Sequence, residues 1–114
     1  MDFRYTTEQQ LLCKSLRDFV QREVPREKDR AYDQSIDYPY DLYQKLADIG
    51  MLGIFIPTEY GGLGLGPIAI TMALETLTYG SITASSILMP TSLGTQLILH
   101  GGSEEQKKEL LPRI

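Results

Sequence analysis

The middle of this 114-residue chain is almost free of charge. Residues 51–100 contain no Lys or Arg and only two acidic side chains, Glu59 and Glu75, whereas residues 1–50 carry 8 basic and 10 acidic side chains. Charged side chains normally occupy the surface of a protein, so a stretch of fifty residues with two charges should be largely covered. A single small domain cannot cover it from every side. We therefore expect part of residues 51–100 to pack against another domain or subunit.

Charge and residue counts also exclude several classes of function. A net charge of −4, with no basic cluster longer than Lys107–Lys108, argues against nucleic-acid binding, which needs a basic surface. One cysteine, Cys13, and one histidine, His100, are too few for a disulfide framework or a His/Cys metal site. The N-terminus lacks the apolar core of a signal peptide, and the apolar runs at 49–57 and 67–74 are too short to span a bilayer. These features favour a cytoplasmic protein without a metal.

Apolar spacing and capping signals predict an all-α, up-and-down domain of about five helices and no reliable strand. The expected helices cover residues 7–24, 39–49, 67–79, 81–100 and 103–111. Thr6 or Thr7 caps the first helix, and Gly50 ends the second in a left-handed conformation. Residues 26–38 are charged and turn-prone and are expected to form a loop.

The last three predicted helices differ in their apolar surface. Helix 67–79 is apolar nearly all round and is therefore expected to be central. Helix 81–100 is expected to bend near Pro90 or Gly94. The final helix is capped by Ser103, with Leu110 and Leu111 as its buried contacts.

The segment Gly64–Ala69 satisfies the glycine pattern of a loop that cradles phosphate groups, and it follows a possible strand at residues 52–56. The intervening loop is too long for the tight turn of such a site, and no acidic residue lies at the expected ribose position. A structural glycine loop is the other interpretation, and the residues favour it.

Three side chains could act in catalysis by their residue type, but none has a second catalytic group near it in the sequence. Glu75 lies alone among apolar residues, where a carboxylate can act as a base, but no second titratable group is near in sequence, so a helix residue that reaches solvent is the simpler interpretation. Cys13 is expected to pack as a small hydrophobic side chain. His100 is expected to cap the end of its helix. We predict no catalytic residue.

Four blocks, in this order along the chain, resemble the opening of acyl-CoA dehydrogenases. They are residues 7–10, residues 38–39 with 46–54, residues 56–65, and residues 102–108 followed by Leu111 and Pro112. The resemblance spans essentially the whole chain and identifies it with the N-terminal helical domain of that family. It implies a longer homo-oligomeric enzyme of fatty acid metabolism, whose central β-domain and C-terminal helical bundle lie outside residues 1–114.

The resemblance also implies the chemistry of the longer protein. Members of the family use FAD, held mainly by the other domains, to dehydrogenate an acyl-CoA thioester between its α and β carbons, and they pass electrons to electron-transfer flavoprotein. The catalytic glutamate of the family belongs to the bundle outside this chain. The domain alone is therefore expected to be inactive and to bind no FAD. The residues that the resemblance assigns to the acyl-chain pocket are Ser85, Met89, Pro90 and Leu93, and the length of Met89 suggests a short or medium acyl chain.

Two other classes stay open. One is a helical interaction module, or the small subunit of a split dehydrogenase, that binds a partner through its apolar surface. The other is a nucleotide-binding fragment that uses Gly64–Ala69, which requires a strand at residues 52–56. The chain stops on apolar residues directly after a helix signal, and we expect it to be part of something longer.

Overall fold

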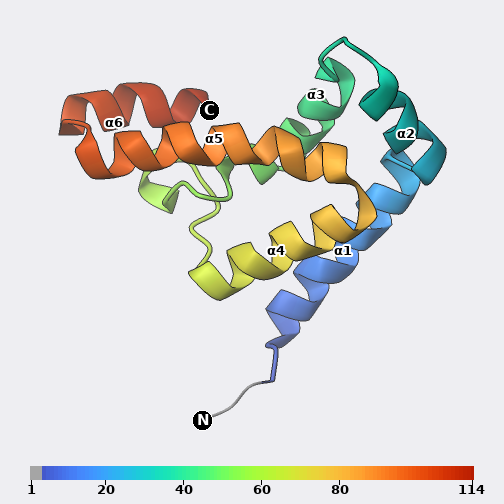
Figure 1. The fold of residues 1–114 in the computed structure, drawn as a ribbon. Coiled ribbons are helices and arrows are strands. Elements are labelled where there is room, and N and C mark those ends of the chain that lie inside the picture. The colour runs from blue at the N-terminus through green and yellow to red at the C-terminus, as the bar shows by residue number, and fades with distance from the viewer. Residues whose placement is uncertain (1–3) are drawn as a thin grey trace. The chain divides into compact units, whose positions relative to one another are not determined.

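The structure is a computed structural model that describes residues 4–114, and within that range it has six α-helices, three 3₁₀ turns and no strand (Figure 1). The helices are α1 (Thr7–Glu23), α2 (Arg26–Gln34), α3 (Tyr40–Asp48), α4 (Pro67–Gly80), α5 (Ile82–Gly101) and α6 (Glu104–Leu110). The turns are η1 (Met51–Gly53), η2 (Thr58–Tyr60) and η3 (Leu111–Arg113). The prediction of an all-α domain is confirmed.

The chain divides into two compact units. The first consists of Met1–Tyr38 and Pro67–Ser85, and the second of Pro39–Gly66 and Ser86–Ile114. The first unit therefore contains α1, α2 and α4, the second contains α3 and α6, and α5 starts in the first unit and continues into the second.

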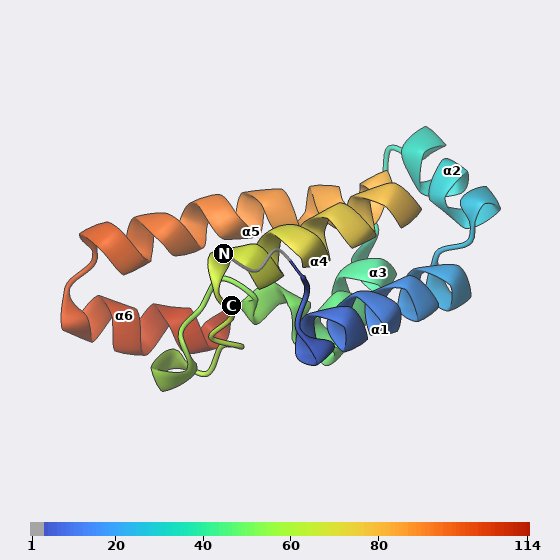
Figure 2. The ribbon, with the colours of Figure 1, turned by 90° about the horizontal axis from the view of Figure 1, so that it is seen from below.

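The first unit is built on the packing of α1 against α4, which lie side by side in both ribbon views (Figures 1 and 2). Thr6 caps α1 as predicted, because its side chain accepts a hydrogen bond from Gln9 N while the Gln9 side chain accepts one from Thr6 N. Gly80 lies close to α1, since a Cβ at this position would be 2.5 Å from Val20 Cγ1. The buried residues of the two helices are Cys13, Leu16, Phe19 and Val20 in α1 and Met72, Ala73 and Leu77 in α4.

The predicted loop at residues 26–38 is wrong over its first nine residues, which form α2. No residue of α2 is buried, so the helix has no apolar stripe that periodicity could detect. Its first turn carries Glu27 and Asp29, which favour a helix N-terminus. Asp29 also accepts a hydrogen bond from the buried Ser81 hydroxyl, which in turn accepts one from Ala84 N at 3.0 Å. The hydrogen bond from Ser81 to Asp29 connects α2 to the start of α5.

The prediction that α4 is central is also wrong. Ile68 and Tyr79 on this helix are 63% and 95% exposed, and only one side of it is buried. The residues of α4 are apolar nearly all round, but α1 provides contacts on one side only. The structure therefore leaves part of the charge-poor segment uncovered, as the expected packing against other domains requires.

In the second unit, α3 ends at Asp48 and is followed, two residues later, by Gly50, whose φ of 78° is the predicted left-handed conformation. In both ribbon views α6 turns back along the C-terminal part of α5 (Figure 2). Ser103 caps α6 through the predicted capping box with Gln106. Leu111 is 1% exposed as expected, but Leu110 is 38% exposed, so its predicted burial is wrong. α5 is one continuous helix with Pro90 inside it.

Candidate functional site

All four side chains predicted to contact the acyl chain lie on α5, but they differ in exposure. Ser85, in the first unit, is 8% exposed and its hydroxyl donates to the Ile82 carbonyl oxygen at 2.9 Å. Met89, Pro90 and Leu93, in the second unit, are exposed. Ser85 therefore has its hydrogen bond satisfied inside its own helix, whereas the other three present their side chains outwards.

Six exposed residues of α5 in the second unit recur at three- and four-residue spacing and form a largely apolar stripe, which we call the α5 face: Ser86, Met89, Pro90, Leu93, Gly94 and Leu97. Gln96 and His100 are also exposed on this part of α5. The three large members, Met89, Leu93 and Leu97, are 59%, 65% and 75% exposed and lie at i, i+4 and i+8, so they follow one another on the same side of the helix. Isolated exposed apolar residues are common, but three in successive helical turns are typical of a surface that contacts another protein segment or a ligand. Leu97 was not among the predicted pocket residues, although its spacing from Leu93 places it on the same stripe of α5.

Four hydroxyl groups on α5, those of Ser85, Thr91, Ser92 and Thr95, donate to carbonyls of the same helix. Thr95 is fully buried and donates to the Thr91 carbonyl at 2.7 Å, and Ser92 donates to the Met89 carbonyl at 2.8 Å. Hydrogen bonding of this kind, to a carbonyl three or four residues earlier, satisfies the hydroxyl without a partner from another element. The hydroxyls of Thr95 and Ser92 are therefore satisfied inside α5.

By length and composition alone, α5 could cross a bilayer, and it is the one helix of residues 4–114 that could, with a mean hydropathy of 1.2. The sequence prediction had named only the shorter apolar runs at residues 49–57 and 67–74. A single helix of this kind is weak evidence, because core helices of globular proteins pass the same test. It does not indicate a membrane span.

The glycine segment does not form the phosphate site that one alternative requires. The expected strand at residues 52–56 is replaced by η1 and a turn. The N–H of Gly64, the first residue of the predicted cradle, already donates to the Ile56 carbonyl at 3.0 Å. The two preceding N–H groups, of Gly62 and Leu63, donate to the Pro57 and Gly53 carbonyls at 3.1 Å each. The nucleotide-binding alternative is therefore wrong, and the glycine segment is a structural corner.

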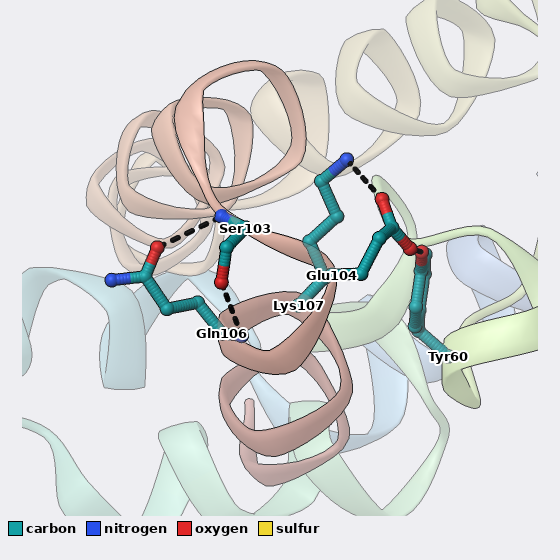
Figure 3. A network of polar contacts seen from close by, with 5 residues as sticks. All are labelled: Tyr60, Ser103, Glu104, Gln106 and Lys107. Atoms are coloured by element: carbon teal, nitrogen blue, oxygen red, sulfur yellow. Dashed lines mark hydrogen bonds and ion pairs between the residues drawn. The ribbon is translucent and has the colours of Figure 1, made fainter.

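A polar network joins this corner to α6 (Figure 3). Glu104, at the start of α6, accepts a hydrogen bond from Tyr60 Oη at 3.1 Å and one from Lys107 Nζ at 2.9 Å. The Lys107 and Tyr60 hydrogen bonds lower the pKa of Glu104 below its usual value. Partial burial and the hydrogen bond to Glu104 raise the pKa of Tyr60, and the Glu104 bond raises that of Lys107. The Tyr60–Glu104 hydrogen bond therefore links η2 to α6.

Because the pKa of Glu104 is lowered by folding, its contribution to stability is present above its unfolded pKa and is lost as the pH falls through the folded value. Glu104→Gln is expected to remove this part of the acid-induced loss of stability. The measurement is the urea midpoint between pH 7 and pH 3. Glu109→Gln is the matched control on the same helix, where the carboxylate pairs with exposed Arg113. Identical pH profiles for wild type and Glu104→Gln would show that the network has no energetic role.

A groove of about 520 Å³ lies between α1 and α4 in the first unit. Its lining residues are Tyr5, Gln10, Cys13, Arg17, Met72, Glu75, Thr76 and Tyr79. Glu75 is exposed, as the simpler sequence interpretation expected. Cys13 is buried with its Sγ 3.9 Å from the Met72 carbonyl oxygen, so it packs as a small hydrophobic side chain, which confirms that prediction.

His100 lies in the last turn of α5, where the helix dipole favours a basic side chain as predicted, and its ring is in contact with a side chain. Its Nε2 lies 3.0 Å from Gln96 Oε1, a side-chain contact within the last turns of α5. Within residues 4–114, His, Cys, Asp and Glu side chains form no group of three or more that could hold a metal ion.

The family model described as "Acyl-CoA dehydrogenase, N-terminal domain" matches residues 6–114. The chain belongs to the acyl-CoA dehydrogenase family. This acyl-CoA dehydrogenase domain is 32% identical over 110 residues to an acyl-CoA dehydrogenase of Bacillus subtilis, with 96% of the chain covered. It is 36% identical over 112 residues to a short-chain specific acyl-CoA dehydrogenase of Clostridium acetobutylicum, with 97% covered, and 36% identical over 117 residues to an acryloyl-CoA reductase (NADH) of Anaerotignum propionicum, with 100% covered.

The domain spans 29% of the length of each of these three relatives. Family membership confirms the resemblance on which the sequence prediction rested, and all four of its blocks have structural roles here. Gln9 in the first block completes the cap of α1, and Gly50 in the second has the left-handed conformation after α3. Block 56–65 forms η2 and the glycine corner, and block 102–108 supplies the capping box of α6. The last two blocks shape the second unit. The assignment of Ser85, Met89, Pro90 and Leu93 to an acyl-chain pocket stays a prediction.

Proposed function

We propose that this domain works within a longer FAD-dependent acyl-CoA dehydrogenase, where the α5 face forms part of the acyl-chain pocket and packs against the other domains. The observation that carries the proposal is the run of Met89, Leu93 and Leu97, more than half exposed in three successive turns of a family member. A hydrocarbon tail gains free energy from each methylene that leaves water, and an apolar helix face without charges is suited to receive it.

In that reaction, bound FAD supplies the acceptor for the β-hydride of the acyl-CoA thioester, while the α-proton passes to a base outside this chain. Residues of the α5 face would position the acyl tail and exclude water from it. They hold no proton that the reaction uses, since Met89, Pro90 and Leu93 carry no titratable group. This domain would therefore affect which acyl chains react more than how the bond is broken. Electron transfer to a flavoprotein partner, homo-oligomer formation and a cytoplasmic location belong to the same proposal.

The assignment of Met89 to the pocket is tested by Met89→Ala in the longer enzyme. Shortening this side chain is expected to enlarge the far end of the pocket and to raise kcat/KM for longer acyl chains relative to short ones by about tenfold, because a single methylene is worth roughly 1–3 kcal/mol in a hydrophobic pocket. Activity is measured across a series of saturated acyl-CoA thioesters. Met89→Leu, which conserves volume, is the control. An unchanged chain-length profile in Met89→Ala would remove Met89 from the pocket.

A second test concerns the domain on its own. The purified 114-residue chain is expected to bind no FAD and to reduce no electron acceptor with acyl-CoA, because the proposal places most flavin contacts in other domains. Flavin absorbance after gel filtration in the presence of FAD provides the measurement, with the longer protein as positive control. Stoichiometric flavin on the isolated chain would contradict this part of the proposal.

A second candidate is the reverse reaction, reduction of an enoyl-CoA thioester. It is favoured by the 36% identity to the acryloyl-CoA reductase (NADH) of Anaerotignum propionicum across this whole chain. Two assays on the longer protein distinguish the directions. A dehydrogenase oxidises acyl-CoA with an artificial electron acceptor, whereas a reductase consumes NADH with enoyl-CoA.

The interaction module and the small subunit of a split dehydrogenase are the remaining alternatives. In both alternatives the α5 face binds a separate chain, whereas in the main proposal it packs against other domains of the same chain. Nucleotide sequence beyond the codon for Ile114 separates them, because the main proposal expects an open reading frame that encodes a β-domain and a second helical bundle.

A further inference from the structure

No further inference is drawn: the strongest candidate, the groove of about 520 Å³ between α1 and α4 in the first unit, is lined by exposed side chains such as Arg17, Glu75 and Tyr79, and nothing in the structure shows what would cover it.

Discussion

Replacing Gly62 with alanine is expected to lower the free energy of unfolding by about 3 kcal/mol, at the upper end of the cost of overpacking. A Cβ at this position would lie 2.0 Å from the carbonyl oxygen of Ile56 and 2.4 Å from its Cβ. The obstacle is mainly backbone, so no side-chain rotation relieves it. The loop itself has little freedom to move, because Gly62 N donates to the Pro57 carbonyl and Gly64 N to the Ile56 carbonyl.

The effect of Gly62→Ala is measured as the urea midpoint and the amide exchange of the second unit. Gly66→Ala is the matched control, because a Cβ there meets nothing within 4 Å and the residue has no positive φ. This control is expected to change stability by less than about 0.5 kcal/mol, or to stabilise slightly by restricting the unfolded chain. Equal midpoints for the two variants would show that the corner does not need a glycine at position 62.

Leu77→Ala is expected to cost about 3 kcal/mol of folding free energy, within the usual range for a leucine truncated in a core. Leu77 is 0% exposed and lies in α4, the helix that packs against α1. Removing its three terminal carbons loses their burial and leaves a cavity that the neighbouring helices can fill only in part. Thermal or urea unfolding of the 114-residue chain measures the loss.

Leu97→Ala is the counterpart for Leu77→Ala, because Leu97 is 75% exposed. In the isolated domain its cost should stay below about 0.5 kcal/mol, as for surface substitutions. In the longer protein the same change should cost more, since the proposal places the α5 face against other domains or the acyl chain. A cost for Leu97→Ala that is equally small in both proteins would mean that this part of α5 stays in water, and the proposed role of the face would fail at Leu97.

Sequence reasoning was accurate where the deciding interactions are local. The caps of α1 and α6 each depend on a hydroxyl and a glutamine three residues later, Thr6 with Gln9 and Ser103 with Gln106. The end of α3 depends on one glycine, Gly50, that can adopt positive φ. Such signals are complete within a few residues, so the printed sequence contains them.

Prediction from the sequence failed where the residues that determine the local structure are far apart in the chain. α2 carries no apolar stripe. One of its tertiary contacts is the hydrogen bond that the Ser81 hydroxyl, 52 residues later in the chain, donates to Asp29. Residues Gly64–Ala69 matched a phosphate loop by pattern, and only the structure showed that no strand precedes them and that the Gly64 N–H is already bonded to the Ile56 carbonyl. A pattern gives residue types but not the groups that surround them.

By itself, the sequence determined that this chain is an all-α member of its family with a charge-poor middle, because composition, periodicity and capping are properties of residues and their near neighbours. Only the tertiary structure decided which side of each apolar helix is covered. Residues 82–98 are apolar on several sides, yet Leu88 is fully buried and Met89, the next residue, is 59% exposed. Helix geometry turns adjacent side chains about 100° apart, and the packing of the other elements then selects the side that leaves water.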